Sequence, residues 1–397
     1  MKKTLILLFL LIPFLAFPAL AEEAEDLTAL STFTVASKGW TMERLSDRDW
    51  ETYWNGEIGG KTVTIKSPEP IHGLYICWMD EPGAWTLEEK TGGEWVSTDF
   101  APGLIQHQYY PLDGATELRL KPSGGSRKWF GMEEIFVLGE GDVPSFVQQW
   151  QQPGNACDLL LFFAHPDDEV LFFGGTLPVY AGEKGLDVVA GVLTPATRTR
   201  KSELLNSLWA MGMTNYPVFG PFHDSFSAKL DRAYEEFGKT RARRFTVELF
   251  RAYRPSVVVT HDLQGEYGHG MHSLCADTAL YAFDAAADAK LFAASADQVG
   301  TWEVNKLYLH LYPENPLVMD WDLPLSAFEG KTGFEVAQAA YLHHDSQQRY
   351  EQFGVEPRSS QYSSYHFGLA KTRVGPDQQK NDFMENTPEG TLQVNSL

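Results

Sequence analysis

Residues 159–170 read LLLFFAHPDDEV, and this stretch decides the fold of the second half of the chain. The apolar run at 159–164 is typical of a strand that is covered on both faces of a parallel sheet. It is followed at once by a histidine and three consecutive acids, which repel one another and destabilise the fold if they are buried unpaired. The stretch therefore predicts a compensating positive charge at the end of the strand, and a divalent cation is the first candidate.

Apolar runs and helical patterns alternate downstream of this strand. An alternation of strands and helices indicates an α/β domain with a mostly parallel sheet and helices on both faces, of Rossmann-like type. We assign it to residues 157–397. Further strands are predicted at 185–194, 216–220 and 255–262, and helices at 202–213, 230–254 (one long amphipathic helix) and 272–287.

A second polar motif follows a later predicted strand. Residues 260–274 read THDLQGEYGHGMHSL and place His269 and His272 in a glycine-rich loop before a helix. Because ligands of open α/β sheets bind at the carboxyl ends of the strands, both motifs are expected at the same edge. Zinc prefers imidazole nitrogen and carboxylate oxygen, and catalytic zinc sites use three protein ligands plus water. The alternatives are a helix cap at Asp168 and a core role for His272, and the pairing of the motifs favours the metal.

The first third of the chain has a different pattern of apolar and polar residues. Short alternating runs separated by turn signals at residues 32–140 predict an antiparallel β-sandwich, and 141–156 is expected to be a linker. Eight of the eleven tryptophans lie between Trp40 and Trp150, which marks this part as a separate module. Most are expected in the core, and one or two on loops would stack on a sugar.

This segment resembles the discoidin or galactose-binding-like sandwich of carbohydrate-binding modules. The resemblance rests on LSDRDWETYW at 45–54, GLYICW at 73–78, TELRLKP at 116–122 and MEEIFVLGE at 132–140. It implies a glycan ligand for the β-sandwich.

The N-terminus predicts export. Residues 1–21 begin with two lysines, continue with an apolar stretch and end in Ala-Leu-Ala, the pattern of a secretory signal peptide. An uncleaved anchor helix is the alternative, but Pro13, Pro18 and the short apolar run argue against a full span. We expect a secreted or extracytoplasmic protein without a transmembrane segment after cleavage.

Charge and cysteine content exclude other classes. The net charge of −21 argues against binding nucleic acid through its phosphates. Three cysteines are too few for a disulfide framework, so Cys77, Cys157 and Cys275 are expected to be small buried apolar residues.

The motifs together resemble the PIG-L or LmbE-like family of zinc-dependent de-N-acetylases. The shared features are AHPDDE at 164–169, GHGMH at 268–272 with a preceding tyrosine, R-x-x-E-L at 200–204 and H-x-S-Q at 344–347. The resemblance covers about residues 158–350.

The family pattern implies roles for the matching residues. His165, Asp168 and His272 would be the ligands of Zn²⁺, although the same ligands accept other divalent transition metals. Asp167 would be the general base, close to the metal but not bound to it. Glu169 is expected to orient or cap rather than to ligate.

The remaining assignments concern the substrate. His269 would act as a second acid/base or stabilise the oxyanion, with the help of Tyr267. Arg200 and Asp224 would contact substrate, with a solvated helix-start charge and a loop cap as their respective alternatives. For His344, a structural role and a functional role remain as alternatives.

The long aromatic tail from residue 348 has two interpretations. It either closes over the pocket or extends the sheet.

These implications predict a hydrolase that uses a metal-activated water to remove the acetyl group from an N-acetylated sugar, an N-acetylglucosamine-type glycan or glycoconjugate. The alternatives are the same zinc amidase acting on a non-sugar amide, and a catalytically silent glycan-binding protein. A silent relative is expected to lack at least one of His165, Asp167, Asp168 and His272, and all four are present.

Overall fold

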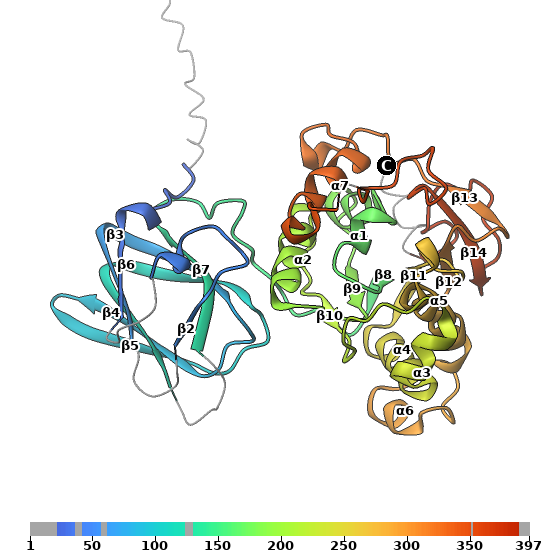
Figure 1. Cartoon of the computed structure of the whole chain (residues 1–397), viewed down its shortest axis with the longest axis horizontal. Coiled ribbons are helices and arrows are strands. Elements are labelled where there is room, and N and C mark those ends of the chain that lie inside the picture. Colours follow the sequence, from blue (N-terminus) through green and yellow to red (C-terminus); the bar gives the residue numbers. More distant parts are fainter. Residues whose placement is uncertain (1–21, 36–41, 57–61, 124–129, 351, 389–397) are drawn as a thin grey trace, which may run out of the picture.

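The computed structural model describes residues 22–35, 42–56, 62–123, 130–350 and 352–388 (Figure 1). The predicted signal peptide, residues 1–21, lies outside the described residues. The described chain forms two seven-stranded sheets, one before and one after residue 150.

The first sheet is antiparallel throughout, as predicted, and is compatible with a β-sandwich module. Its order is β2-β7-β3-β6-β4-β5, with β1 paired to β3. The two long strands β3 and β6 pair with each other in the middle of the sheet. Trp54, Trp78 and Trp85 are almost fully buried in the core of this part, so they are structural. The strands are β1 (Thr32–Val35), β2 (Trp54–Gly56), β3 (Val63–Trp78), β4 (Trp85–Thr91), β5 (Glu94–Phe100), β6 (His107–Pro122) and β7 (Phe130–Leu138).

The second sheet is mixed, in the order β10-β9-β8-β11-β12-β14-β13. The strands from β10 to β12 are parallel, which follows the predicted alternation, whereas β14 is antiparallel to both β12 and β13. The tail therefore extends the sheet. The strands are β8 (Cys157–Phe163), β9 (Val188–Val192), β10 (Val218–Phe219), β11 (Pro255–Thr260), β12 (Lys306–His310), β13 (Pro316–Val318) and β14 (His366–Thr372).

The helices pack in two groups against β8. Leu159 and Leu161 share a core cluster with α2 and α7, whereas Leu160 and Phe162 share another with α3, α4 and α5. The helices are α1 (Asp168–Leu171), α2 (Arg198–Ala210), α3 (Leu230–Phe237), α4 (Lys239–Tyr253), α5 (Gly270–Ala285), α6 (Ala293–Val299) and α7 (Gly333–Tyr341).

The prediction of one long helix at 230–254 is wrong. Gly238 has a φ of +80°, so it ends α3 and α4 begins at the next residue. Glycine adopts this backbone conformation without steric penalty, which allows the sharp change of direction.

The cysteines behave as the sequence predicted. Cys77, Cys157 and Cys275 are all buried and free. They act as small apolar side chains. In the described part of the chain, no helix has both the length and the apolar character needed to cross a bilayer.

Polar contacts join the N-terminal sheet and the segment predicted as a linker to α2, which lies on the side of the second domain that faces the first (Figure 1). Gln148 Nε2 donates to Asn206 Oδ1 over 2.7 Å. Trp209 Nε1 donates to the carbonyl oxygen of Ser145 over 2.8 Å. The two parts of the chain are thus held in a defined arrangement along α2.

Glu133 of β7 lies buried in this interface, where it accepts a hydrogen bond from the Ser202 hydroxyl. Burial raises its pKa from 4.5 to about 8. Between these pH values the folded chain keeps a proton on Glu133 that the unfolded chain has lost. The contribution of Glu133 to the free energy of unfolding is therefore fully present below pH 4.5 and is lost as the pH rises towards 8.

Glu133→Gln is therefore expected to flatten the pH dependence of stability. Relative to the variant, the parent should lose up to about 1.4 kcal/mol of unfolding free energy per pH unit in this window. Thermal melts at pH 5 and pH 8.5 measure the effect, with Glu69→Gln on the surface as control. If parent and variant lose the same stability between pH 5 and pH 8.5, the assignment is contradicted.

Candidate active site

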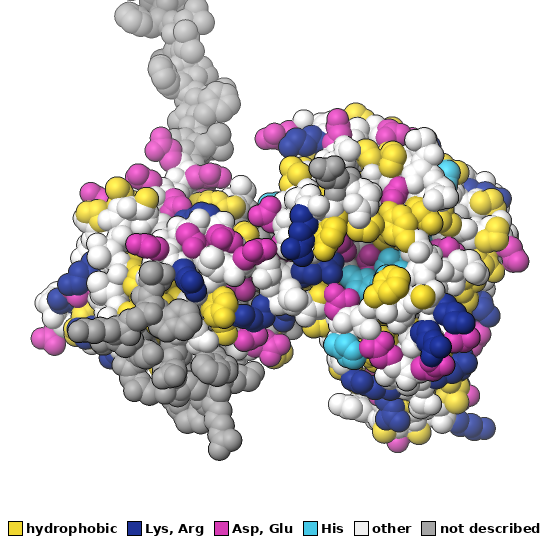
Figure 2. Space-filling view, in the orientation of Figure 1, with side chains coloured by type: hydrophobic (Ala, Val, Ile, Leu, Met, Phe, Trp, Pro, Cys, Tyr) yellow, Lys and Arg dark blue, Asp and Glu magenta, His cyan; other side chains and the backbone are white. Residues whose placement is uncertain are grey.

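All eight predicted site residues line one pocket of about 170 Å³. The pocket lies where β8 and β11 end, and Figure 2 shows histidine side chains in a hollow of this face. The sequence motifs were separated by about a hundred residues, and the parallel pairing of β8 with β11 brings them together. These residues are His165, Asp167, Asp168, Arg200, Asp224, Tyr267, His269 and His272.

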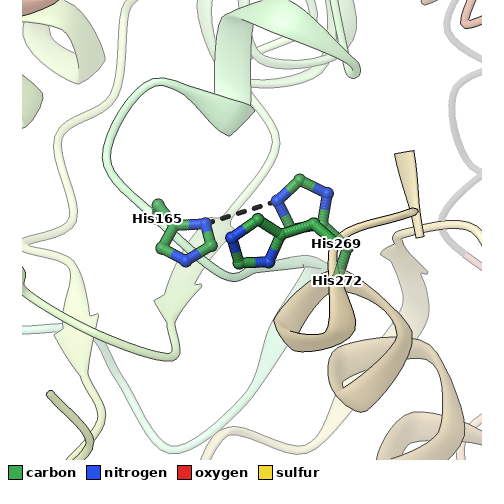
Figure 3. A group of neighbouring side chains, drawn as sticks. All are labelled: His165, His269 and His272. Carbon is green, nitrogen blue, oxygen red and sulfur yellow. Dashed lines mark hydrogen bonds between the residues drawn. The ribbon is translucent and has the colours of Figure 1, made fainter. Parts of the chain in front are cut away.

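Imidazole nitrogens surround the Asp168 carboxylate at the centre of the pocket. His165 Nδ1 lies 3.3 Å from Asp168 Oδ2, and His272 Nε2 lies 3.4 Å from Asp168 Oδ1. The two imidazoles approach each other as well, with 3.3 Å between His272 Nε2 and His165 Nδ1 (Figure 3). The Asp168 carboxylate also accepts the backbone N–H of His165 over 2.7 Å. Asp168 is the first residue of α1 and Asp167 occupies the N-cap position, so Asp168 is not the helix cap.

This donor set fits a tetrahedral metal. Ligand atoms about 2.1 Å from a zinc ion at tetrahedral angles are about 3.4 Å apart, which matches the separations among His165, Asp168 and His272. His269 and His261 extend the cluster, because each forms a group with His272 whose donor atoms lie within 4.8 Å of one another.

Glu266 orients the histidines from behind. Its fully buried carboxylate lies 2.9 Å from His272 Nδ1, 2.8 Å from His261 Nδ1 and 2.5 Å from His310 Nδ1. Burial alone would raise the Glu266 pKa, but the three imidazoles hold it well below its usual range. A carboxylate that accepts Nδ1–H of His272 leaves Nε2 free for a metal, as in carboxylate–histidine–metal sites.

Glu266→Gln is expected to weaken metal binding by about 10- to 100-fold, because an amide N–H then faces imidazole N–H groups. A competition titration with a chelating dye measures the affinity. Glu303→Gln, on the exposed surface, is the matched control. An unchanged affinity in Glu266→Gln would show that Glu266 does not orient the ligands.

Asp167 lines the same pocket as the candidate metal ligands and contacts Arg200. Its φ of +110° is unusual for a non-glycine residue and directs the side chain differently from a regular helix start. Its Oδ1 lies 3.0 Å from Arg200 Nη2, and the same guanidinium donates to the Pro166 carbonyl and, over 3.3 Å, to Asp224 Oδ2. Burial raises the pKa of Asp167, and the Arg200 charge opposes that rise.

A buried network fixes the backbone of Asp167. Glu169 Oε2 accepts the N–H of Asp167 over 2.8 Å, while Glu169 Oε1 accepts the Ser207 hydroxyl at 2.7 Å and lies 2.6 Å from His344 Nε2. Glu169 orients, as expected, and His344 acts through it rather than by lining the pocket.

His269 caps α5. Its Nδ1 accepts the backbone N–H of Met271 over 3.3 Å, so the neutral ring carries its proton on Nε2. Burial and the imidazoles of His272 and His165 lower the pKa of His269 to about 3. His269 is thus a neutral hydrogen-bond donor beside His165 and His272.

The tail covers one side of the pocket. The Tyr267 hydroxyl donates to Glu356, and the Tyr267 ring packs against Tyr362 and Phe353 at centroid distances of 4.5 and 5.6 Å. Phe353 also lines the pocket. The tail therefore lines one side of the pocket in addition to extending the sheet.

Comparisons with known proteins show the family of the chain. A family model described as PIG-L, GlcNAc-PI de-N-acetylase, matches residues 160–283. The 1D-myo-inositol 2-acetamido-2-deoxy-alpha-D-glucopyranoside deacetylase 2 of Saccharopolyspora erythraea is 32% identical over 206 residues, which cover 45% of this chain and 72% of the relative. The chain belongs to the PIG-L family.

A second relative of this PIG-L chain is also a sugar deacetylase by name. The corresponding deacetylase 1 of Catenulispora acidiphila is 31% identical over 193 residues, with 42% of this chain and 59% of the relative covered. The chain thus spans under two thirds of the length of that relative. The N,N'-diacetylchitobiose deacetylase structure from Pyrococcus horikoshii matches 49% of this chain and 74% of its own, with 16% identity and a TM-score of 0.39.

Sequence reasoning missed three buried members of the PIG-L site. His261 and Glu266 stand inside the quoted loop motif, and His310 ends β12, the next parallel strand. The available signal was position, because polar residues at the carboxyl ends of adjacent parallel strands converge on one edge.

Proposed function

We propose that this chain is a secreted, zinc-dependent amide hydrolase that removes the acetyl group from an N-acetylglucosamine-type glycan or glycoconjugate. One observation carries the proposal: Asp167 stands beside a complete two-histidine, one-aspartate ligand set in the same pocket. The sugar deacetylases among its relatives support the substrate class.

The residues that would hold the metal are His165, Asp168 and His272. A bound zinc ion lowers the pKa of water and polarises a carbonyl oxygen. Glu266 keeps His272 in the tautomer that presents Nε2, and the His165 N–H bond fixes the Asp168 carboxylate. The chain thus supplies a preorganised set of donors rather than flexible side chains.

Asp167 is placed to accept a proton from the attacking water and to return it to the leaving amine. Its raised pKa suits both tasks, because a general base works best with a pKa near the working pH. The contact with Arg200 keeps the carboxylate in the pocket, and the hydrogen bond from its N–H to Glu169 fixes its backbone.

His269 is placed to stabilise the oxyanion that forms at the acetyl carbonyl. With Nδ1 engaged by Met271, its Nε2–H is the available donor, and a neutral donor requires no proton transfer. Arg200 and Asp224, linked over 3.3 Å at the pocket wall, are placed to contact sugar hydroxyls.

Export and glycan binding complete the proposal. The signal-peptide pattern at residues 1–21 supports secretion, and the resemblance of residues 32–140 to carbohydrate-binding sandwiches supports a carbohydrate ligand. Both features fit an enzyme that works on extracellular sugars.

The test is release of acetate and free amine from N-acetylglucosamine, its β-1,4-linked oligomers, glycoside conjugates and simple acetamides. Acetate from a sugar substrate, lost on chelation and restored by zinc, is the expected result. If acetate is released from simple acetamides alone, the substrate is a non-sugar amide. Stoichiometric zinc without any hydrolysis would contradict the catalytic assignment.

A further inference from the structure

A second cavity, of about 590 Å³, lies between the N-terminal sheet and α2. We call it the interdomain cavity and define it by Trp50, Tyr75, Phe136, Phe146, Asn206 and Trp209. None of these residues lines the catalytic pocket. The sandwich and the catalytic domain both contribute to its wall, so it exists only in the assembled chain.

Aromatic rings form its apolar wall. Phe136 and Phe146 pack with 5.0 Å between their ring centroids, and Tyr75 lies 5.5 Å from Phe136. Phe146 remains 43% exposed, although it belongs to this packed group. Trp209 closes the wall from α2, held by its hydrogen bond to Ser145. Such rings offer flat apolar faces to a ligand.

Polar groups converge on the same space. Gln148 donates to Asn206 Oδ1, which turns the amide nitrogen of Asn206 into the available donor. Tyr75 also lines the cavity, although it is only 1% exposed and its hydroxyl lies beside the Cys77 thiol and the backbone of Gln148. His343 also lines the cavity, and burial together with His344 lowers its pKa, so it is neutral.

The wall is uncharged. Among the described residues that line the interdomain cavity there is no Asp, Glu, Lys or Arg, although the chain carries a net charge of −21. An ionic ligand would find no counter-charge there. Flat apolar faces combined with amide, hydroxyl and imidazole groups suit a ring that has apolar faces and hydroxyl edges.

We propose that the interdomain cavity binds an uncharged sugar unit of the glycan on which the catalytic pocket acts. Only the identity of that glycan rests on the proposed function. Helix α2 carries Arg200 at the catalytic pocket and Trp209 at the cavity, about 14 Å apart along the helix axis. A second site on the same chain favours oligosaccharides over monosaccharides.

The test is calorimetric titration of the purified chain carrying Asp167→Asn, which suppresses hydrolysis. The probes are the β-1,4-linked N-acetylglucosamine tetramer and cellotetraose, which has no acetamido group. In this background Ala210→Arg places a long charged side chain at the cavity wall, and Phe146→Ala removes an exposed ring. Trp95→Ala, on β5 and away from both sites, is the matched control.

For the N-acetylglucosamine tetramer, Ala210→Arg is expected to raise Kd at least about tenfold. Phe146→Ala should raise this Kd less, and Trp95→Ala should leave it unchanged. Hydrolysis of the N-acetylglucosamine monosaccharide by Ala210→Arg, with Asp167 intact, should equal that of the parent. Equal affinity of Ala210→Arg and parent for the N-acetylglucosamine tetramer, or no binding of either probe, would overturn the inference. If the binding difference appears while no sugar is deacetylated, the proposed function fails and this inference stands.

Discussion

Asp167→Asn is expected to lower kcat for deacetylation by about a thousandfold while leaving the metal content at one ion per chain. The amide keeps the size of the side chain but cannot accept a proton, and general-base catalysis contributes about 10²- to 10⁴-fold. Because Asp167 is not part of the His165, Asp168 and His272 cluster, the ligands stay in place. Acetate release and metal analysis on the same preparation measure both quantities.

Asp224→Asn is the control for this variant. Asp224 lines the same pocket and contacts the same Arg200, but its side chain is 39% exposed and contacts Nη1 of the guanidinium group, whereas Asp167 contacts Nη2. It is expected to raise KM more than it lowers kcat. Equal losses of kcat in the two variants would show that Asp167 acts through Arg200 rather than as the base.

His272→Ala is expected to abolish both metal binding and hydrolysis. His272 contacts Asp168 and His165 through Nε2 and Glu266 through Nδ1, so its removal deletes one ligand and leaves a buried carboxylate with fewer partners. Metal content should fall below about one tenth of an ion per chain, because three protein ligands are the usual set of a catalytic zinc site.

His223→Ala controls for the loss of an imidazole elsewhere. His223 has a 70% exposed side chain, contacts Glu236 and is not among the residues that line the pocket. It should keep the metal and the activity of the parent. Circular dichroism and a thermal melt separate ligand loss from unfolding in His272→Ala. A folded variant that retains a full equivalent of metal would rule out His272 as a ligand.

The sequence was sufficient for features that depend on local pattern and on one topological rule. Apolar runs identify β8 and β11, and parallel pairing requires that Asp168 and His272 meet at their carboxyl ends. The antiparallel character of the first sheet followed from its alternating runs.

Other features depend on contacts between distant segments and leave little local trace. The buried role of Glu266 appears only when His261, His272 and His310 surround it. The pairing of β14 and the contact between Glu356 and Tyr267 join residues far apart in the sequence. The break at Gly238 is local, but a single glycine inside a helical pattern is compatible with a continuous helix as well.

The place of β14 in the sheet constrains how the chain is synthesised and folds. β13 joins the sheet through β14, which lies between it and β12 and is made about fifty residues later. While the ribosome is still adding those residues, the nascent chain already carries every candidate metal ligand. It still lacks the edge of its sheet, the pocket wall that Phe353 provides, and the contacts of Glu356 and Tyr362 with Tyr267. A chain that stops near residue 350 would therefore display an open, unfinished pocket, and completion of the site waits for the C-terminal segment.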